Sequence, residues 1–249
     1  MPWVEVFAVF TVCHLTGDYL LQTDWQARNK RGGLGSNPVA RRALQYEEKE
    51  EAWKGKLAIY YLPDSRDFKS FIRSVVAMQP SGIHYELRSD DPFIVDPVDG
   101  PAKATEADQF AHSAAIVAGG YLKAKGSSAA LPEWLVGGFG RVTALRAEGL
   151  NSRRYLAHKS AARSAANRGG KPTELWGDTK PANADVLANS FAEYLAYGPG
   201  AANFTKLISG LRPDDNGNTP SAPAAFEAAG WKDLAMLEAA WKKWAATGK

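Results

Sequence analysis

Every strand-like segment of this chain falls before residue 99, and this order constrains the fold more than any other feature of the sequence. Short apolar runs rich in β-forming residues occupy residues 55–63, 82–89 and 92–98. A helical apolar pattern at 66–78 separates the first run from the second, and from residue 105 onward the periodicity is mostly helical. Because the later helices are not interleaved with strands, the pattern predicts an α+β domain with a small N-terminal β-sheet, a mainly helical C-terminal part and no parallel β-α-β unit.

The start of the chain has a different character from the rest. Residues 2–25 form its most apolar stretch and predict an appended hydrophobic helix. The stretch lacks the basic start and the small-residue cleavage site of a secretory signal. Glu5, His14 and Asp18 interrupt it, which makes a membrane span costly. Helical spacing places His14, Asp18 and Gln22 on one face.

Residues 14–30, HLTGDYLLQTDWQARNK, resemble the opening of a family of small bacterial integral membrane proteins. This resemblance covers about residues 1–45 and implies membrane association through residues 3–22. The later membrane helices of that family have no counterpart here, so we interpret the segment as a fused or truncated remnant. A charge run follows at 47–51. We therefore predict a domain boundary near residue 45, with a hydrophobic helix and basic linker at 1–45 and one larger domain at 46–249.

The composition of the chain excludes several classes of protein. Cys13 is the only cysteine, which excludes an intrachain disulfide and a cysteine-based zinc finger. The net charge of +3 is small for 249 residues, and no block of basic residues indicates a nucleic-acid groove. One stretch is locally basic, and we interpret it as a solvated helix face, with phosphate binding as the alternative. Its basic residues are Arg153, Arg154, Lys159, Arg163, Arg168 and Lys171.

Residues 106–117, EADQFAHSAAIV, have the spacing of a zinc-peptidase helix. A His-Glu-x-x-His motif places two histidines one turn apart on one zinc ion, and its glutamate takes a proton from the zinc-bound water. The corresponding positions in this chain are Asp108, Gln109 and His112, so only the second histidine is present. A third protein ligand would be needed to complete such a site.

Three further segments carry a resemblance to a clan of zinc peptidases. They read WKGKLAIYYLPDSRDFKSFIRSVV, LPEWLVGGFG and FEAAGWKDLAMLEAAWKKW. Together they resemble the thermolysin-like gluzincins, and more narrowly the bacterial peptidase-MA-like members of that clan, over residues 46–249. Those members read Pro-x-Trp-Leu-x-Glu-Gly across the second helix, where the glutamate is the third zinc ligand. Gly137 stands at that position here.

The number of available ligands predicts a degenerate site without catalysis. A catalytic zinc takes three protein ligands, and this arrangement offers at most Asp108 and His112. Gln109 cannot act as a carboxylate base, and Gly137 contributes no ligand. Two alternatives are a rewired metal site and an Ala-rich core helix that resembles the motif by chance.

Two nearby carboxylates are candidate substitute ligands. Glu106 and Glu133 are close to the motif in sequence, although Glu133 suits the first turn of its own helix, where negative charge complements the helix dipole. A lone histidine such as His112 is, by itself, typical of a hydrogen-bonded structural histidine rather than of a ligand.

These observations predict a non-catalytic metallopeptidase-like protein, or pseudo-peptidase, of bacterial type. The gluzincin resemblance implies that a remnant cleft binds an extended peptide or protein segment at the sheet edge. We expect no cofactor and no nucleic-acid partner, and a cytoplasmic or inner-membrane-associated location. The alternatives are a zinc-dependent hydrolase with altered ligands and a membrane-tethered structural protein. Core packing is predicted for four tryptophans at apolar helix positions, Trp134, Trp231, Trp241 and Trp244.

Overall fold

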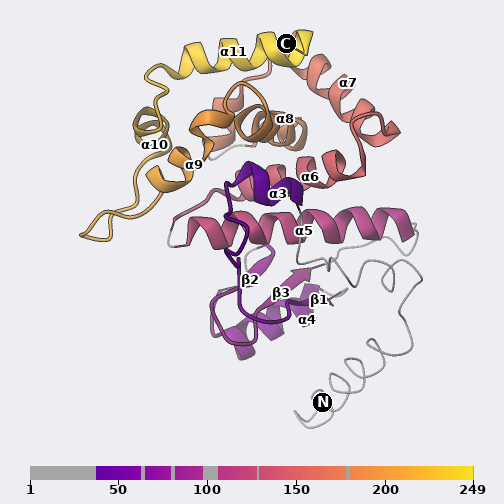
Figure 1. The fold of residues 1–249 in the computed structure, drawn as a ribbon, viewed down its shortest axis with the longest axis vertical. Helices are drawn as coiled ribbons and strands as arrows, with labels where there is room; N and C mark the ends of the chain where they lie inside the picture. The colour runs from indigo at the N-terminus through magenta and orange to yellow at the C-terminus, as the bar shows by residue number, and fades with distance from the viewer. Residues whose placement is uncertain are drawn as a thin grey trace. The chain divides into compact units, whose positions relative to one another are not determined.

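The computed structural model describes residues 38–62, 65–79, 82–97, 106–127, 129–177 and 180–248 (Figure 1), without the side chains of residues 65, 106, 107, 109 and 110. Contacts divide the chain into residues 1–36 and residues 37–249, and all described elements belong to the second unit. The predicted hydrophobic helix and the predicted membrane association of residues 3–22 lie outside the described residues.

Within the second unit the helices are stacked in layers on one another, with the sheet at one end (Figure 1). Strand β1 is Ala58–Leu62, β2 is His84–Glu86 and β3 is Phe93–Pro97. The helices are α3 Pro38–Ala43, α4 Ser65–Phe71, the π-helical turn η1 Ile72–Val76, α5 Glu106–Gly126, α6 Glu133–Glu148, α7 Arg153–Asn167, the 3-10 turn η2 Pro172–Trp176, α8 Ala184–Tyr197, α9 Ala201–Gly210, α10 Ala222–Ala228 and α11 Leu234–Thr247.

The three described strands form one sheet in the order β1-β3-β2. This confirms the predicted α+β class, with a small sheet ahead of a mainly helical part. β2 pairs antiparallel to β3, whereas β1 pairs parallel to β3, with Ala58 opposite Phe93. The expectation of no parallel β-α-β unit is therefore wrong. α4 and η1 lie between β1 and β3 in the chain and supply the crossover that parallel strands require.

Each face of the sheet packs against a different helix. Phe68 of α4 and Ile72 of η1 pack with Val95 of β3 on one face. On the other face Ile94 packs with Ile116 of α5. Since successive side chains of a strand point to opposite faces, the position after Val95 faces α5 again. This alternation places a polar side chain of β3 opposite the polar residues of α5.

Helices α5 and α6 pack antiparallel with their backbones very close together. A Cβ on Gly140 would lie 2.3 Å from the carbonyl oxygen of Ala115, and a Cβ on Gly119 would lie 3.2 Å from a methyl carbon of Val136. At Gly140 no side chain fits without movement of the backbone, and at Gly119 the side chains of Val136 and Tyr85 would have to shift, since the Tyr85 hydroxyl is 2.8 Å from that Cβ. The two glycines therefore fix the register in which the helices meet.

The helical core is built around aromatic side chains of α8. Phe191 stacks on Trp134, with ring centroids 5.7 Å apart, and Trp241 donates from Nε1 to Ser190 Oγ at 3.1 Å. The four tryptophans predicted in the core are confirmed there, since Trp241 and Trp244 are buried and Trp134 and Trp231 pack partly buried against the same cluster.

Helix α3 belongs to this core although the sequence placed it with the N-terminal segment. It contacts α5 and α6, and Ala40 and Leu44 are fully buried. The compact unit consequently begins at Asn37, ahead of the change in composition near residue 45. Among the described residues, no helix combines the length and the apolarity needed to cross a bilayer.

Candidate functional site

The polar residues of α5 meet the sheet at the end of β3. Asp96 of β3 is 3% exposed, and its Oδ2 lies 2.6 Å from Nε2 of His112. The side chain of His112 is 44% exposed, so the pair joins a buried carboxylate to an imidazole at the surface. Because a carboxylate oxygen accepts, Nε2 of His112 is the donor in this contact. The predicted hydrogen-bonded histidine at position 112 is confirmed.

Two hydroxyl groups lie close to this pair. Tyr61 of β1 is opposite Asp96 in the strand register, and its hydroxyl lies 2.6 Å from Ser113 Oγ on α5. Burial raises the pKa of Tyr61, the hydrogen bond with Ser113 lowers it, and the charge of Asp96 raises it again, with a net upward shift. We refer to Tyr61, Asp96, His112 and Ser113 as the sheet cluster.

Asp108, one helical turn before His112, is held by α7. Arg154 donates from Nη2 to Asp108 Oδ1 at 2.5 Å, and its Nη1 lies 3.7 Å from Oε2 of Glu148 on α6. The guanidinium of Arg154 thus bridges carboxylates on two helices. The side chain of Asp108 is 52% exposed, so this contact is a surface ion pair.

Gly137, the third position of the zinc-peptidase pattern, lies apart from Asp108 and His112. It is exposed, and a Cβ there would meet nothing within 4 Å. Its neighbour Val136 contacts Gly119, so the antiparallel register sets position 137 about two turns of α5 beyond His112. Two turns of α-helix separate these positions by roughly 10 Å along the axis.

Of the two candidate substitute ligands, only Glu133 has a described side chain. Glu133 lies in the first turn of α6, as the helix-dipole argument predicted, and its Oε1 is 3.5 Å from where a Cβ on Gly82 would be. Burial lowers the pKa of Lys123, and the nearby charge of Glu133 partly opposes that shift. The side chains of Gln109 and Glu106 lie outside the described residues.

The side chains that the structure describes do not form a three-ligand zinc site. Within the described ranges, no three His, Cys, Asp or Glu side chains lie together as metal ligands would. Arg154 pairs with Asp108, and Nε2 of His112 faces the carboxylate of Asp96. Gly137 supplies no ligand and lies at a different level of the helix pair.

A second polar centre, which sequence reasoning missed, lies among α6, α7 and α8. Glu193 of α8 is fully buried. Its Oε1 accepts from Arg146 Nη1 at 2.9 Å and from the Tyr155 hydroxyl at 2.5 Å. Its Oε2 accepts from His158 Nε2 at 2.9 Å and from Lys159 Nζ at 3.3 Å. We refer to these five residues as the Glu193 cluster.

The Glu193 carboxylate is ionised despite its burial. Burial by itself would raise its pKa, but hydrogen bonds from His158 and Tyr155 and the charge of Lys159 outweigh that effect and hold the pKa at about 2. All four donors are at least partly buried, so the cluster has little contact with solvent. We therefore assign it a structural role that ties α6 and α7 to α8.

Sequence spacing gave no signal for the Glu193 cluster. His158 has no acidic neighbour at a motif distance, because its partner Glu193 is 35 residues away in the chain. The cations also pack on aromatic faces, with Lys159 Nζ 3.7 Å from the centroid of Trp244. Helical periodicity marks buried positions but does not show which of them meet.

Comparison with known proteins finds no relative of this chain. No protein-family model matches the chain, and no curated protein and no solved structure matches it.

Proposed function

We propose that the unit from Asn37 onward is a non-catalytic, metallopeptidase-like domain that binds an extended peptide. The proposal rests on the gluzincin resemblance of the sequence together with the geometry of α5. One observation carries it. The two remaining side chains of the zinc-peptidase pattern, Asp108 and His112, have other partners in Arg154 and Asp96.

The expected order of elements supports the comparison with gluzincins. A small sheet precedes the helix that holds the motif, and a second helix packs antiparallel against it. The third-ligand position on that second helix, Gly137, is about two turns of α5 away from His112. Among the described side chains, a metal would therefore have one histidine and one ion-paired aspartate, which is fewer than the three protein ligands of a catalytic zinc.

The sheet edge is where we propose that a peptide binds. β2 pairs with β3 on one side, and no described strand pairs with it on the other. An edge strand presents backbone N–H and C=O groups that an extended peptide can pair with. The sheet cluster lies on the α5 face of the same sheet, but Tyr61 belongs to β1, so β2 and β3 would separate it from a peptide on the outer edge of β2.

Zinc titration and a protease assay on the full chain test the absence of catalysis. Calorimetric titration is expected to show no stoichiometric zinc binding, and casein is expected to remain uncleaved with or without chelator. His112→Ala should leave both results unchanged. One zinc per chain, with chelator-sensitive cleavage that His112→Ala abolishes, would instead establish the zinc-dependent hydrolase.

Hydrogen exchange tests the peptide site separately. Addition of a tryptic digest of casein is expected to slow amide exchange at His84–Glu86, because strand addition protects the outer edge of β2. Exchange in α11, at the far end of the described unit, serves as the internal reference. Unchanged exchange in β2 at saturating peptide would reject the sheet edge as the binding site.

A further inference from the structure

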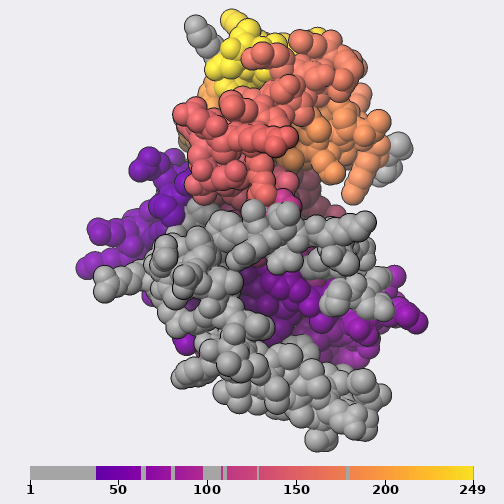
Figure 2. Space-filling view, turned by 90° about the vertical axis from the view of Figure 1, so that its right-hand side faces the viewer, coloured from indigo at the N-terminus to yellow at the C-terminus, as the bar shows by residue number. Residues whose placement is uncertain are grey.

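The outward face of α7 is rich in basic residues, and these residues have no part in the proposed peptide binding. Residues 153–171 hold six basic residues and no aspartate or glutamate. Figure 1 shows α7 at the outside of the helical layers beside α11, and Figure 2 shows this part of the chain, in salmon, exposed toward the viewer. The positive charge of the stretch is therefore available at a surface.

The contacts of these basic residues divide them into two groups. Arg154 and Lys159 are held by carboxylates of the protein, on Asp108, Glu148 and Glu193. The other four are exposed, and none of them forms an ion pair with a described carboxylate. They are Arg153, Arg163, Arg168 and Lys171.

Exposed leucines lie beside these cations. Leu150, just before α7, is 49% exposed, and Leu156 is 55% exposed. Arg153, Leu156, Ser160 and Arg163 follow one another at intervals of three and four residues, which places them on one stripe of the helix. Each of these four positions is exposed, while the opposite side of α7 packs against the core.

We propose that this surface docks on an anionic lipid bilayer. We call it the α7 face, made of Leu150, Arg153, Leu156, Arg163, Arg168 and Lys171. The argument is charge complementarity, because unpaired Arg and Lys side chains are attracted to the negative surface of anionic lipids. Two half-exposed leucines next to the cations supply apolar surface that can enter the headgroup region.

A nucleic acid is the other anionic macromolecule that such a charge distribution could attract. The composition of the face favours lipid, since Tyr155, the one aromatic residue of α7, is buried. Proteins that bind single-stranded nucleic acid stack its bases on exposed aromatic side chains, and leucine does not replace that contact. The proposal is independent of the peptide site, which lies on the sheet.

Vesicle co-sedimentation of the full chain tests the proposal. Binding is expected with vesicles of phosphatidylcholine and phosphatidylglycerol, is expected to fall as sodium chloride rises, and should be weak with phosphatidylcholine alone. The double change Arg153→Glu and Arg163→Glu should weaken binding by tenfold or more, because each basic residue strengthens it by roughly fivefold. Leu156→Ser should weaken binding by a few-fold.

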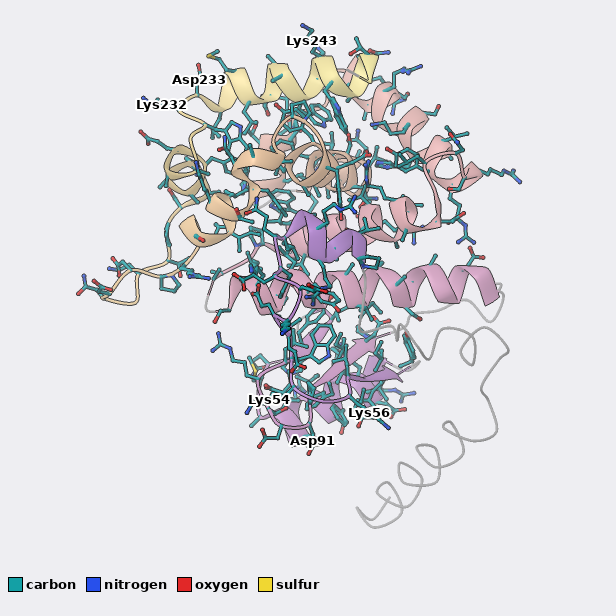
Figure 3. All side chains as sticks on the ribbon, in the orientation of Figure 1. Lys54, Lys56, Asp91, Lys232, Asp233 and Lys243 are labelled. Atoms are coloured by element: carbon teal, nitrogen blue, oxygen red, sulfur yellow. The ribbon has the colours of Figure 1, made fainter. Side chains whose placement is uncertain are left out.

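A matched control separates the α7 face from net charge. Lys56→Glu together with Lys232→Glu makes the same change in charge at exposed lysines, which Figure 3 shows away from α7, before β1 and before α11, and it should leave binding unchanged. Thermal unfolding of every variant establishes that it is folded.

Three results would overturn the proposal. One is equal binding to both kinds of vesicle, which would point to a contact that ignores lipid charge. Another is equal weakening by the control pair. The last is salt-sensitive binding to duplex DNA that the Arg153 and Arg163 changes abolish, with no binding to vesicles.

Discussion

The two buried carboxylates of this protein, Asp96 and Glu193, differ in what surrounds them. Glu193 accepts hydrogen bonds from four side chains of α6 and α7, all of them at least partly buried. Asp96 accepts from one described side chain, His112, which is 44% exposed. Both acids are almost without solvent contact, but the partner of Asp96 is more exposed, at 44%, than Arg146 and Lys159, at 23% and 22%.

This difference indicates different roles for the two centres. A buried charge that the interior satisfies completely adds rigidity, and removing it leaves other buried charges without a partner. A buried acid that orients a solvent-exposed imidazole can lose its partner at smaller cost, because water replaces it. We therefore expect the Glu193 cluster to contribute more to the stability of the fold than the sheet cluster does.

The largest effect is expected from Glu193→Ala. Arg146 and Lys159 would lose their shared counter-charge inside the protein, and we expect the free energy of unfolding to fall by about 3–5 kcal/mol. Urea unfolding at neutral pH measures it. Glu148→Ala is the control, since its exposed pair with Arg154 should be worth less than about 1 kcal/mol. Equal losses for both variants would remove the distinction between the two regions.

Acid should weaken the Glu193 cluster in a defined pH range. The folded-state pKa of Glu193 is lowered from its ordinary value of 4.5 to about 2. Its stabilisation is thus fully present above pH 4.5 and is lost as the pH falls toward 2. The difference in unfolding free energy between the wild type and Glu193→Gln should shrink over that range by about 3 kcal/mol. A difference that grows on acidification would contradict the lowered pKa.

Removal of α3 is expected to cost stability where the sheet region joins the helical region. A chain that starts at Tyr46 lacks Ala40 and Leu44, which are fully buried against α5 and α6. Compared with a chain that starts at Asn37, we expect a loss of about 2–3 kcal/mol. Thermal unfolding of the two chains measures it. Equal unfolding temperatures for the two chains would instead support a domain boundary near residue 45, as the composition suggested.

A smaller loss is expected from Gly140→Ala at the contact of α5 with α6. The new Cβ would lie 2.3 Å from the Ala115 carbonyl oxygen, so the helices must separate, at a cost of about 1–3 kcal/mol. Gly137→Ala is the matched control, because its Cβ would meet nothing and alanine favours a helix by up to about 1 kcal/mol. Opposite signs for the two changes are expected in urea unfolding, and a common sign would contradict the packing.

The smallest effect is expected from Asp96→Ala in the sheet cluster. His112 would lose its partner but remain hydrated, so we expect a loss of about 1–2 kcal/mol in the free energy of unfolding. A loss as large as that of Glu193→Ala would show that the sheet cluster is structural after all.

The sequence predicted the elements of this fold because their signals are local. Alternation and apolar periodicity located all three described strands and the helices that hold the candidate residues, including α6, whose first turn holds Glu133 as expected. The apolar positions of the four tryptophans correctly placed them in the core. That positions 108, 109 and 137 do not carry the residues of the zinc-peptidase pattern was likewise visible in the sequence.

What the tertiary structure alone decided is which residues meet. The parallel pairing of β1 with β3 depends on the path of the chain through α4, which strand composition does not encode. Asp96 reaches His112 over 16 residues, and Glu193 reaches Arg146 over 47, because sheet and helix faces come together only when the core is packed. Apolar periodicity shows that a side chain is buried, but the register between two elements determines which side chain it contacts. That register is set by close contacts between the elements, such as the contact of Gly140 with Ala115.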